Sequence, residues 1–112
     1  MEITVDTQDE ITMVTLAGRL DSATSIEVTD QVMPQVQSTG SVLVDMSRVK
    51  YMSSAGLRML LKLHRAVHND GGKVVLVGLA ETLQEVMDIT GFLDFFTISK
   101  TYDEGMRVLQ TS

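Results

Sequence analysis

The amino-acid sequence predicts an α/β fold: one domain over residues 1–112, with a mixed β-sheet of about four to five strands, an N-terminal hairpin and about four helices. Stretches rich in Val, Ile and Thr alternate with stretches whose apolar residues recur every three or four positions. Residues 42–46 and 73–78 are mostly apolar, which is typical of strands buried on both faces. With one proline and no internal repeat, the chain shows no linker between domains.

Residues 2–7 and 10–17 predict the hairpin, because both are rich in Ile, Val and Thr. Residues 18–22 are expected to end the second strand, and Asp21 or Ser22 to cap the first helix. That helix is predicted by Val28, Val32 and Val36, which repeat at i, i+4 and i+8, with Ile26 and Met33 alongside. Pro34 is expected to kink or shorten it.

The middle of the chain predicts a turn at residues 38–41, a strand at 42–46, a loop at 47–53 and a helix at 54–69. The helix has an inward apolar set, Leu57, Leu60, Leu61, Leu63 and Val67. It also has one solvated stripe, Arg58, Lys62, Arg65 and Asn69.

The last part of the chain repeats the alternation. Gly71 and Gly72 should end the preceding helix, and residues 73–78 should form a buried strand. A third helix, stopped at Gly91, is marked by the apolar residues Leu79, Leu83, Val86 and Met87. Residues 95–98 predict a short strand, and residues 102–110 a closing helix with Met106 and Leu109 inward.

Composition excludes several classes of function. The chain has no cysteine, which removes disulfide frameworks, thiol catalysis and zinc–thiolate sites. Its net charge of −6 makes nucleic acid and anionic membrane surfaces poor partners. No apolar run is long enough to span a bilayer, and the first residues do not resemble a secretory signal. We therefore expect a soluble, cytoplasmic protein.

Catalytic and cofactor motifs are missing from the sequence. It contains neither a glycine-rich phosphate loop nor a GxSxG nucleophile elbow, so we expect no enzyme activity and no cofactor. His64 and His68 have the i, i+4 spacing of a metal-binding pair but lack the glutamate of an HExxH motif. The preferred interpretation is a half-buried His64, an exposed His68 and no metal. The eight methionines are scattered and indicate core filling rather than a partner groove.

The most informative stretch is residues 42–61, in which a strand and a loop lead to a helix that begins near Ser54. There the hydroxyl group of Ser54 would be exposed at the positive end of the helix dipole. On local chemistry alone the favoured interpretation of Ser54 is a helix cap worth ~1 kcal/mol, and the alternative is a site of regulatory phosphorylation.

This stretch resembles the signature of the STAS domain, the family of bacterial anti-sigma factor antagonists. The family's D-x-S strand end and D/S-S-S/T/A-G-L helix start are matched by Asp45-Met46-Ser47 and by Ser53-Ser54-Ala55-Gly56-Leu57. Residues 18–21 resemble its G-x-L-D motif, residues 72–77 its third core strand, and residues 90–96 its link into the last strand. The resemblance extends over nearly the whole chain.

The resemblance implies a regulatory cycle. The unphosphorylated protein would bind an anti-sigma factor that is also a serine kinase, and so free the sigma factor. That kinase would phosphorylate Ser54, the pair would separate, and a Ser/Thr protein phosphatase would reset the cycle. The residues expected to bind the partner are Asp21, Asp45, Ser53, Ala55, Gly56 and Arg58.

Two positions depart from the family pattern. Ser53 occupies a place where aspartate is usual, so Ser53 is a possible second phosphorylation site. Arg58 replaces a small residue; it can pair with a phosphate one turn away or belong only to the solvated stripe. The alternative function is a STAS scaffold or ligand-sensing module without a serine switch. The sequence does not identify the kinase, phosphatase, sigma factor, stimulus or oligomeric state.

Overall fold

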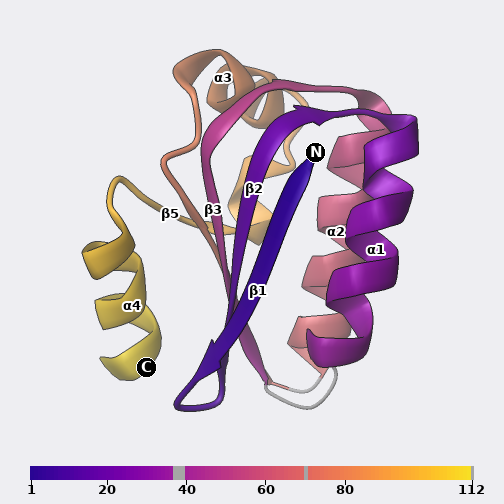
Figure 1. Ribbon diagram of the computed structural model, residues 1–112. Helices are drawn as coiled ribbons and strands as arrows, with labels where there is room; N and C mark the ends of the chain where they lie inside the picture. The colour runs from indigo at the N-terminus through magenta and orange to yellow at the C-terminus, as the bar shows by residue number, and fades with distance from the viewer. Residues whose placement is uncertain (37–39, 70, 112) are drawn as a thin grey trace.

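The computed structural model describes residues 1–36, 40–69 and 71–111. Strands and helices alternate as the sequence predicts (Figure 1). In order, the elements are β1 (Glu2–Gln8), β2 (Ile11–Leu20), α1 (Ser22–Val36), β3 (Ser41–Met52), α2 (Ser54–Asn69), β4 (Val74–Val77), α3 (Glu81–Ile89), the 3₁₀ helix η1 (Leu93–Phe95), β5 (Thr97–Ser99) and α4 (Tyr102–Thr111).

The five strands form one mixed sheet in the order β1-β2-β3-β4-β5. β1 and β2 pair antiparallel as the predicted hairpin, and the other neighbours pair parallel. This confirms the predicted fold class, a mixed sheet with an N-terminal hairpin and four helices. β2 and β3 remain paired up to Leu20 and Met52, whereas β4 pairs with β3 only as far as Asp45 and β1 pairs with β2 only as far as Ala17. The ends of β2 and β3 therefore project beyond the sheet as a two-stranded ribbon.

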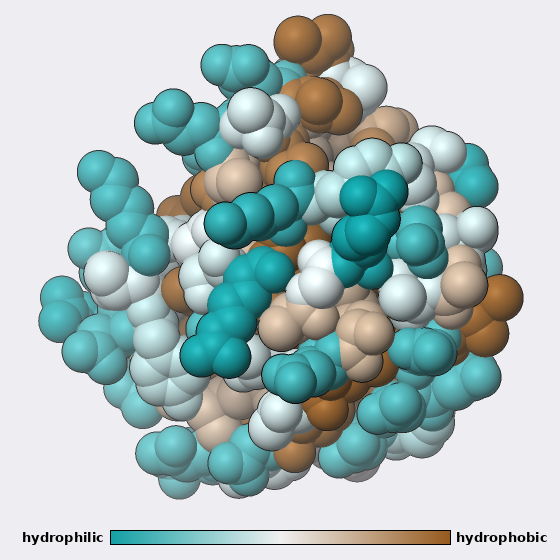
Figure 2. Space-filling view, turned by 45° about the horizontal axis from the view of Figure 1, so that its top comes forward, coloured by the Kyte–Doolittle hydropathy of each residue, from teal (hydrophilic) through white to brown (hydrophobic). Residues whose placement is uncertain are grey.

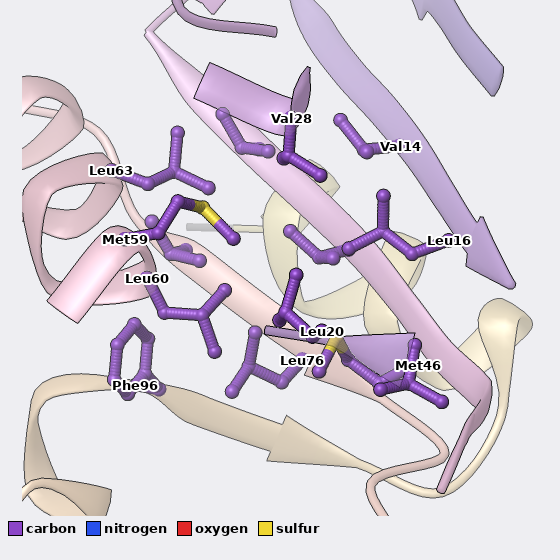
Figure 3. Packing of buried hydrophobic residues seen from close by; sticks show 14 of the residues in the cluster. Val14, Leu16, Leu20, Val28, Met46, Met59, Leu60, Leu63, Leu76 and Phe96 are labelled. Atoms are coloured by element: carbon purple, nitrogen blue, oxygen red, sulfur yellow. The ribbon is translucent and has the colours of Figure 1, made fainter. Parts of the chain in front are cut away.

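Helices cover both faces of the sheet (Figure 1). The larger core joins α1, α2 and α3 to one face, and Figure 3 shows Met59, Leu60 and Leu63 of α2 directed toward sheet residues. On the other face, Met106 and Leu109 of α4 pack on a smaller cluster. Since both faces are covered, the central strands need apolar residues at successive positions, and Val42, Leu43 and Val44 are all buried.

The two long strands correct the sequence analysis. β2 does not end at Gly18 but continues to Leu20 through a register shift, with Gly18 at φ 128°. The predicted loop at residues 47–53 is wrong as well, because β3 extends to Met52. Arg48, Lys50 and Tyr51 are exposed here, so this part of the strand lacks the apolar alternation by which a strand is recognised.

Smaller differences concern the helices and the last strand. Ile26 and Val86 belong to the apolar patterns that predict α1 and α3, but their side chains are 63% and 51% exposed. Pro34 lies inside α1, which ends two residues later at Val36. Phe95 belongs to η1, and β5 begins only at Thr97. The predicted turn at 38–41 falls largely outside the described residues.

Candidate functional site

Two adjacent serines at the start of α2 have different roles in the fold. The hydroxyl oxygen of Ser53 accepts the N–H of Gly56 at 3.4 Å, and its carbonyl accepts the N–H of Leu57 at 3.1 Å. Ser53 is therefore the N-cap and is half-buried. Ser54 is the first residue of the helix; it is exposed, and its hydroxyl has no hydrogen-bond partner among the described residues. The prediction of an exposed Ser54 at a helix start is confirmed.

The end of β2 holds this helix start in place. The N–H of Ser53 donates to the carbonyl of Leu20 at 2.9 Å. A Cβ atom on Gly56 would lie 2.9 Å from that same carbonyl oxygen and 2.8 Å from Cγ of Met52, closer than non-bonded atoms approach. Only glycine leaves enough room here, so the position of Ser54 depends on Gly56 and on the hydrogen bond from Ser53.

Asp21 caps α1 beside this point. Its Oδ1 accepts the N–H groups of Ala23 at 3.1 Å and Thr24 at 3.0 Å, and its own N–H donates to Oγ1 of Thr24 at 2.8 Å. This is a reciprocal cap of the capping-box type. The hydrogen bond from the Thr24 amide is the main reason why the pKa of Asp21 lies below its usual value, against the opposing effect of burial.

The structure brings together most of the residues that were expected to bind a partner. Asp21 follows Leu20, to which Ser53 is bonded; Ala55 and Gly56 lie in the first turn of α2, and Arg58 is exposed one turn further on. Asp45 lies elsewhere. Its carboxylate accepts the N–H of Ser47 at 2.9 Å, and roughly 20 Å of extended strand separates it from the end of β3.

The sequence analysis did not predict a contact between Arg19 and Tyr51 near the same edge. Cζ of Arg19 lies 4.0 Å from the centroid of the Tyr51 ring, in a cation–π arrangement. The two residues are paired because the register shifts between Gly18 and Arg19, which no local pattern indicates. Figure 2, with the top of Figure 1 turned toward the viewer, shows strongly hydrophilic side chains across the middle of this end of the molecule.

The histidine pair lies in an aromatic cluster away from Ser54. The rings of His64 and His68 stack with centroids 5.3 Å apart, and His64 also contacts Phe95 and Phe96. Burial, followed by the nearby charges of His68 and Arg65, lowers the pKa of His64. As predicted, His64 is half-buried and His68 is exposed. Among the described residues, no three His, Cys, Asp or Glu are placed to hold a metal ion, and no helix is long and apolar enough to cross a membrane.

Known proteins resemble this chain over most or all of its length. A model of the STAS domain family matches residues 2–105. BtrV of Bordetella bronchiseptica is 29% identical over 113 residues, covering 100% of this chain and 97% of BtrV. BtrV is named as a proposed anti-sigma factor antagonist. The anti-sigma-B factor antagonist of Staphylococcus epidermidis is 28% identical over 101 residues, covering 89% and 94% of the two chains.

The fold is also similar to that of SpoIIAA from Bacillus, which is described as an anti-sigma factor antagonist. Structures of SpoIIAA are known for the unphosphorylated and the phosphorylated form. The unphosphorylated form gives a TM-score of 0.84 at 16% identity, covering 99% of this chain and 98% of SpoIIAA. The phosphorylated form gives 0.77 at 17% identity, covering 95% and 97%. At such identities the likeness shows the fold alone.

Proposed function

Because this chain belongs to the STAS domain family, we propose that it is an anti-sigma factor antagonist whose binding to a serine-kinase anti-sigma factor is controlled by phosphorylation of Ser54. The unphosphorylated protein binds the kinase through the surface around the start of α2. Transfer of a phosphoryl group to Ser54 releases it, and a Ser/Thr protein phosphatase restores the free hydroxyl. The proposed domain comprises residues 1–112, acts in the cytoplasm and is regulatory rather than enzymatic.

The observation that carries the proposal is the difference between the two serines. The Ser53 hydroxyl is engaged as a cap and half-buried, whereas the Ser54 hydroxyl is exposed and has no partner among the described residues. A kinase needs a hydroxyl that can enter its active site, and Ser54 supplies one without loss of a hydrogen bond. This supports Ser54 over Ser53 as the phosphorylated residue.

Electrostatics supports a switch that acts on binding and leaves the fold intact. A phosphate on Ser54 would add roughly −1.5 to −2 charge at the positive end of α2, where the helix dipole stabilises an anion. SpoIIAA, which has been determined in both forms, has a fold similar to this chain in each. A partner surface that packs against a neutral hydroxyl would have to bury the added charge, which is costly without a matching cation.

The test uses the chain together with the serine-kinase anti-sigma factor from the same genome. After incubation with ATP, intact-mass spectrometry should show the gain of one phosphate, in Ser53→Ala as in the unaltered protein but not in Ser54→Ala. In the absence of ATP, Ser54→Ala should retain binding to the kinase. Ser54→Asp should weaken that binding at least tenfold.

Two outcomes would contradict the proposal. Equal kinase affinity of Ser54→Asp and Ser54→Ala would show that charge at this position does not control binding. A protein that neither binds the kinase nor gains a phosphate would instead favour the STAS scaffold or ligand-sensing module.

A further inference from the structure

A surface groove runs between α1 and α2, directly beside the start of α2. Ala55, the residue after Ser54, lies on its wall. The other side chains that matter for its chemistry come from both helices: Ser25, Ile26 and Asp30 from α1, and Arg58, Met59 and Lys62 from α2.

Two side chains of α1 in this groove lack the surroundings that their chemistry favours. Ile26 is 63% exposed, although apolar side chains of this size are usually buried. Oγ of Ser25 is buried, the residue being only 6% exposed, and has no hydrogen-bond partner in the described part of the chain. Buried hydroxyl groups are nearly always hydrogen-bonded, so this oxygen would gain a partner if the Ser25 side chain turned toward a polar group in the groove.

The α2 side of the groove is cationic in an otherwise acidic protein. Residues 46–69 contain five Lys and Arg and no Asp or Glu, whereas the whole chain carries −6. Arg58 and Lys62, both exposed, line the groove and form no ion pair with the described residues. Asp30 is the only carboxylate in the lining, so the lining itself has a net positive charge.

We infer that this groove docks an acidic segment of the partner protein. A carboxylate of that segment pairs with Arg58 and Lys62, an apolar side chain packs on Ile26 and Met59, and a polar group bonds with Oγ of Ser25. The inference rests on the proposed function, because it assigns the partner's chemistry at the same edge. It also explains release, since a phosphate on Ser54 stands at the end of the groove and repels an acidic segment.

The first test measures the groove without any kinase. A short capped peptide of three glutamates and one leucine is titrated into the ¹⁵N-labelled protein, and amide shifts are followed by NMR. Shifts should concentrate at Ser25, Ile26, Ala55 and Arg58, decrease with added salt, and be absent with the matching lysine peptide. Shifts spread evenly over the surface, or no shifts at all, would overturn the inference.

The second test compares two variants with the same charge in association with the kinase. Arg58→Glu/Lys62→Glu and Lys73→Glu/Lys100→Glu each change the net charge from −6 by −4 to −10, and all four residues are exposed. At low salt the groove variant should associate at least ~10-fold more slowly than the unaltered protein, and the control less than ~3-fold more slowly. Equal loss in both variants would mean that only net charge matters and would refute the groove.

The two tests separate this inference from the proposed function. If the glutamate peptide binds the groove but no kinase phosphorylates Ser54, the docking surface stands and the switch fails. If Ser54 is phosphorylated but the peptide does not bind the groove and the two charge variants lose the same association rate, the switch stands and the docking surface fails.

Discussion

Replacing Gly56 with alanine is expected to destabilise the protein by about 1–2 kcal/mol. The new methyl group would lie 2.8 Å from Cγ of Met52 and 2.9 Å from the carbonyl oxygen of Leu20, and overpacking of this kind costs about 1–3 kcal/mol. Alanine favours a helix over glycine by at most about 1 kcal/mol. The Met52 side chain can turn away, but the carbonyl is held by the N–H of Ser53, so we expect the clash to exceed the gain.

Thermal and urea denaturation followed by circular dichroism would measure this loss, which corresponds to a fall in Tm of about 4–8 °C for a chain of this size. Gly105→Ala in α4 is the matched control. There the nearest atoms are side-chain carbons of Leu43 and Val77, both at 2.9 Å, which can shift more easily than backbone. If Gly56→Ala is as stable as the unaltered protein, or more stable than Gly105→Ala, then α2 is not held against β2 as we describe.

Three further predictions concern the site and the histidine pair. Ser53→Ala should lower the free energy of unfolding, measured by urea denaturation, by about 0.5–1 kcal/mol because it removes a long cap hydrogen bond. Ser54→Ala should leave the free energy of unfolding unchanged. Equal losses in the two variants would contradict the assignment of Ser53 as the cap. The lowered pKa of His64 means that the unfolded chain binds its proton more readily, so stability should fall as the pH decreases through about 6.5 toward the folded-state pKa. His64→Phe should abolish this dependence, while His68→Gln retains it. The pKa of Asp21 is also lowered, so the stability that its carboxylate contributes is present above the unfolded pKa of about 3.9 and is lost as the pH falls through the folded value. NMR titration of the Asp21 carboxyl group would measure the folded pKa. The Asp21→Asn variant should lose less stability in acid than the unaltered protein.

Periodicity predicts the fold well where one face of an element is covered. The bounds of α2, from Ser54 to Asn69, agree with the prediction because its apolar residues follow the helical repeat closely. The far ends of β2 and β3 were missed for the opposite reason. Beyond Asp45 the ribbon has exposed polar side chains, and its strand character comes from pairing between distant segments of the chain.

The candidate site was predictable where it depends on local chemistry. An exposed Ser54 and a capping Asp21 follow from residue types next to a helix start. Asp45 was grouped with them because the strand was expected to end there. Ile26 was counted in the apolar pattern of the first helix because it neighbours the periodic valines, yet only the packing of α1 against α2 decides which flanking residues remain outside. The unpartnered Ser25 could not be found without three-dimensional contacts.

Insertions and deletions in the ribbon formed by β2 and β3 are restricted by the geometry of the strands. Each residue of extended chain advances about 3.3 Å, so deleting two from the outer part of β3 would retract the helix start by roughly 7 Å while each side chain kept its face. Deleting one would exchange inward and outward residues and place Val49 in water. Length variation among relatives should therefore concentrate in the turns at the opposite end of the sheet. The outer part of β3, which determines the position of Ser54, should keep its length.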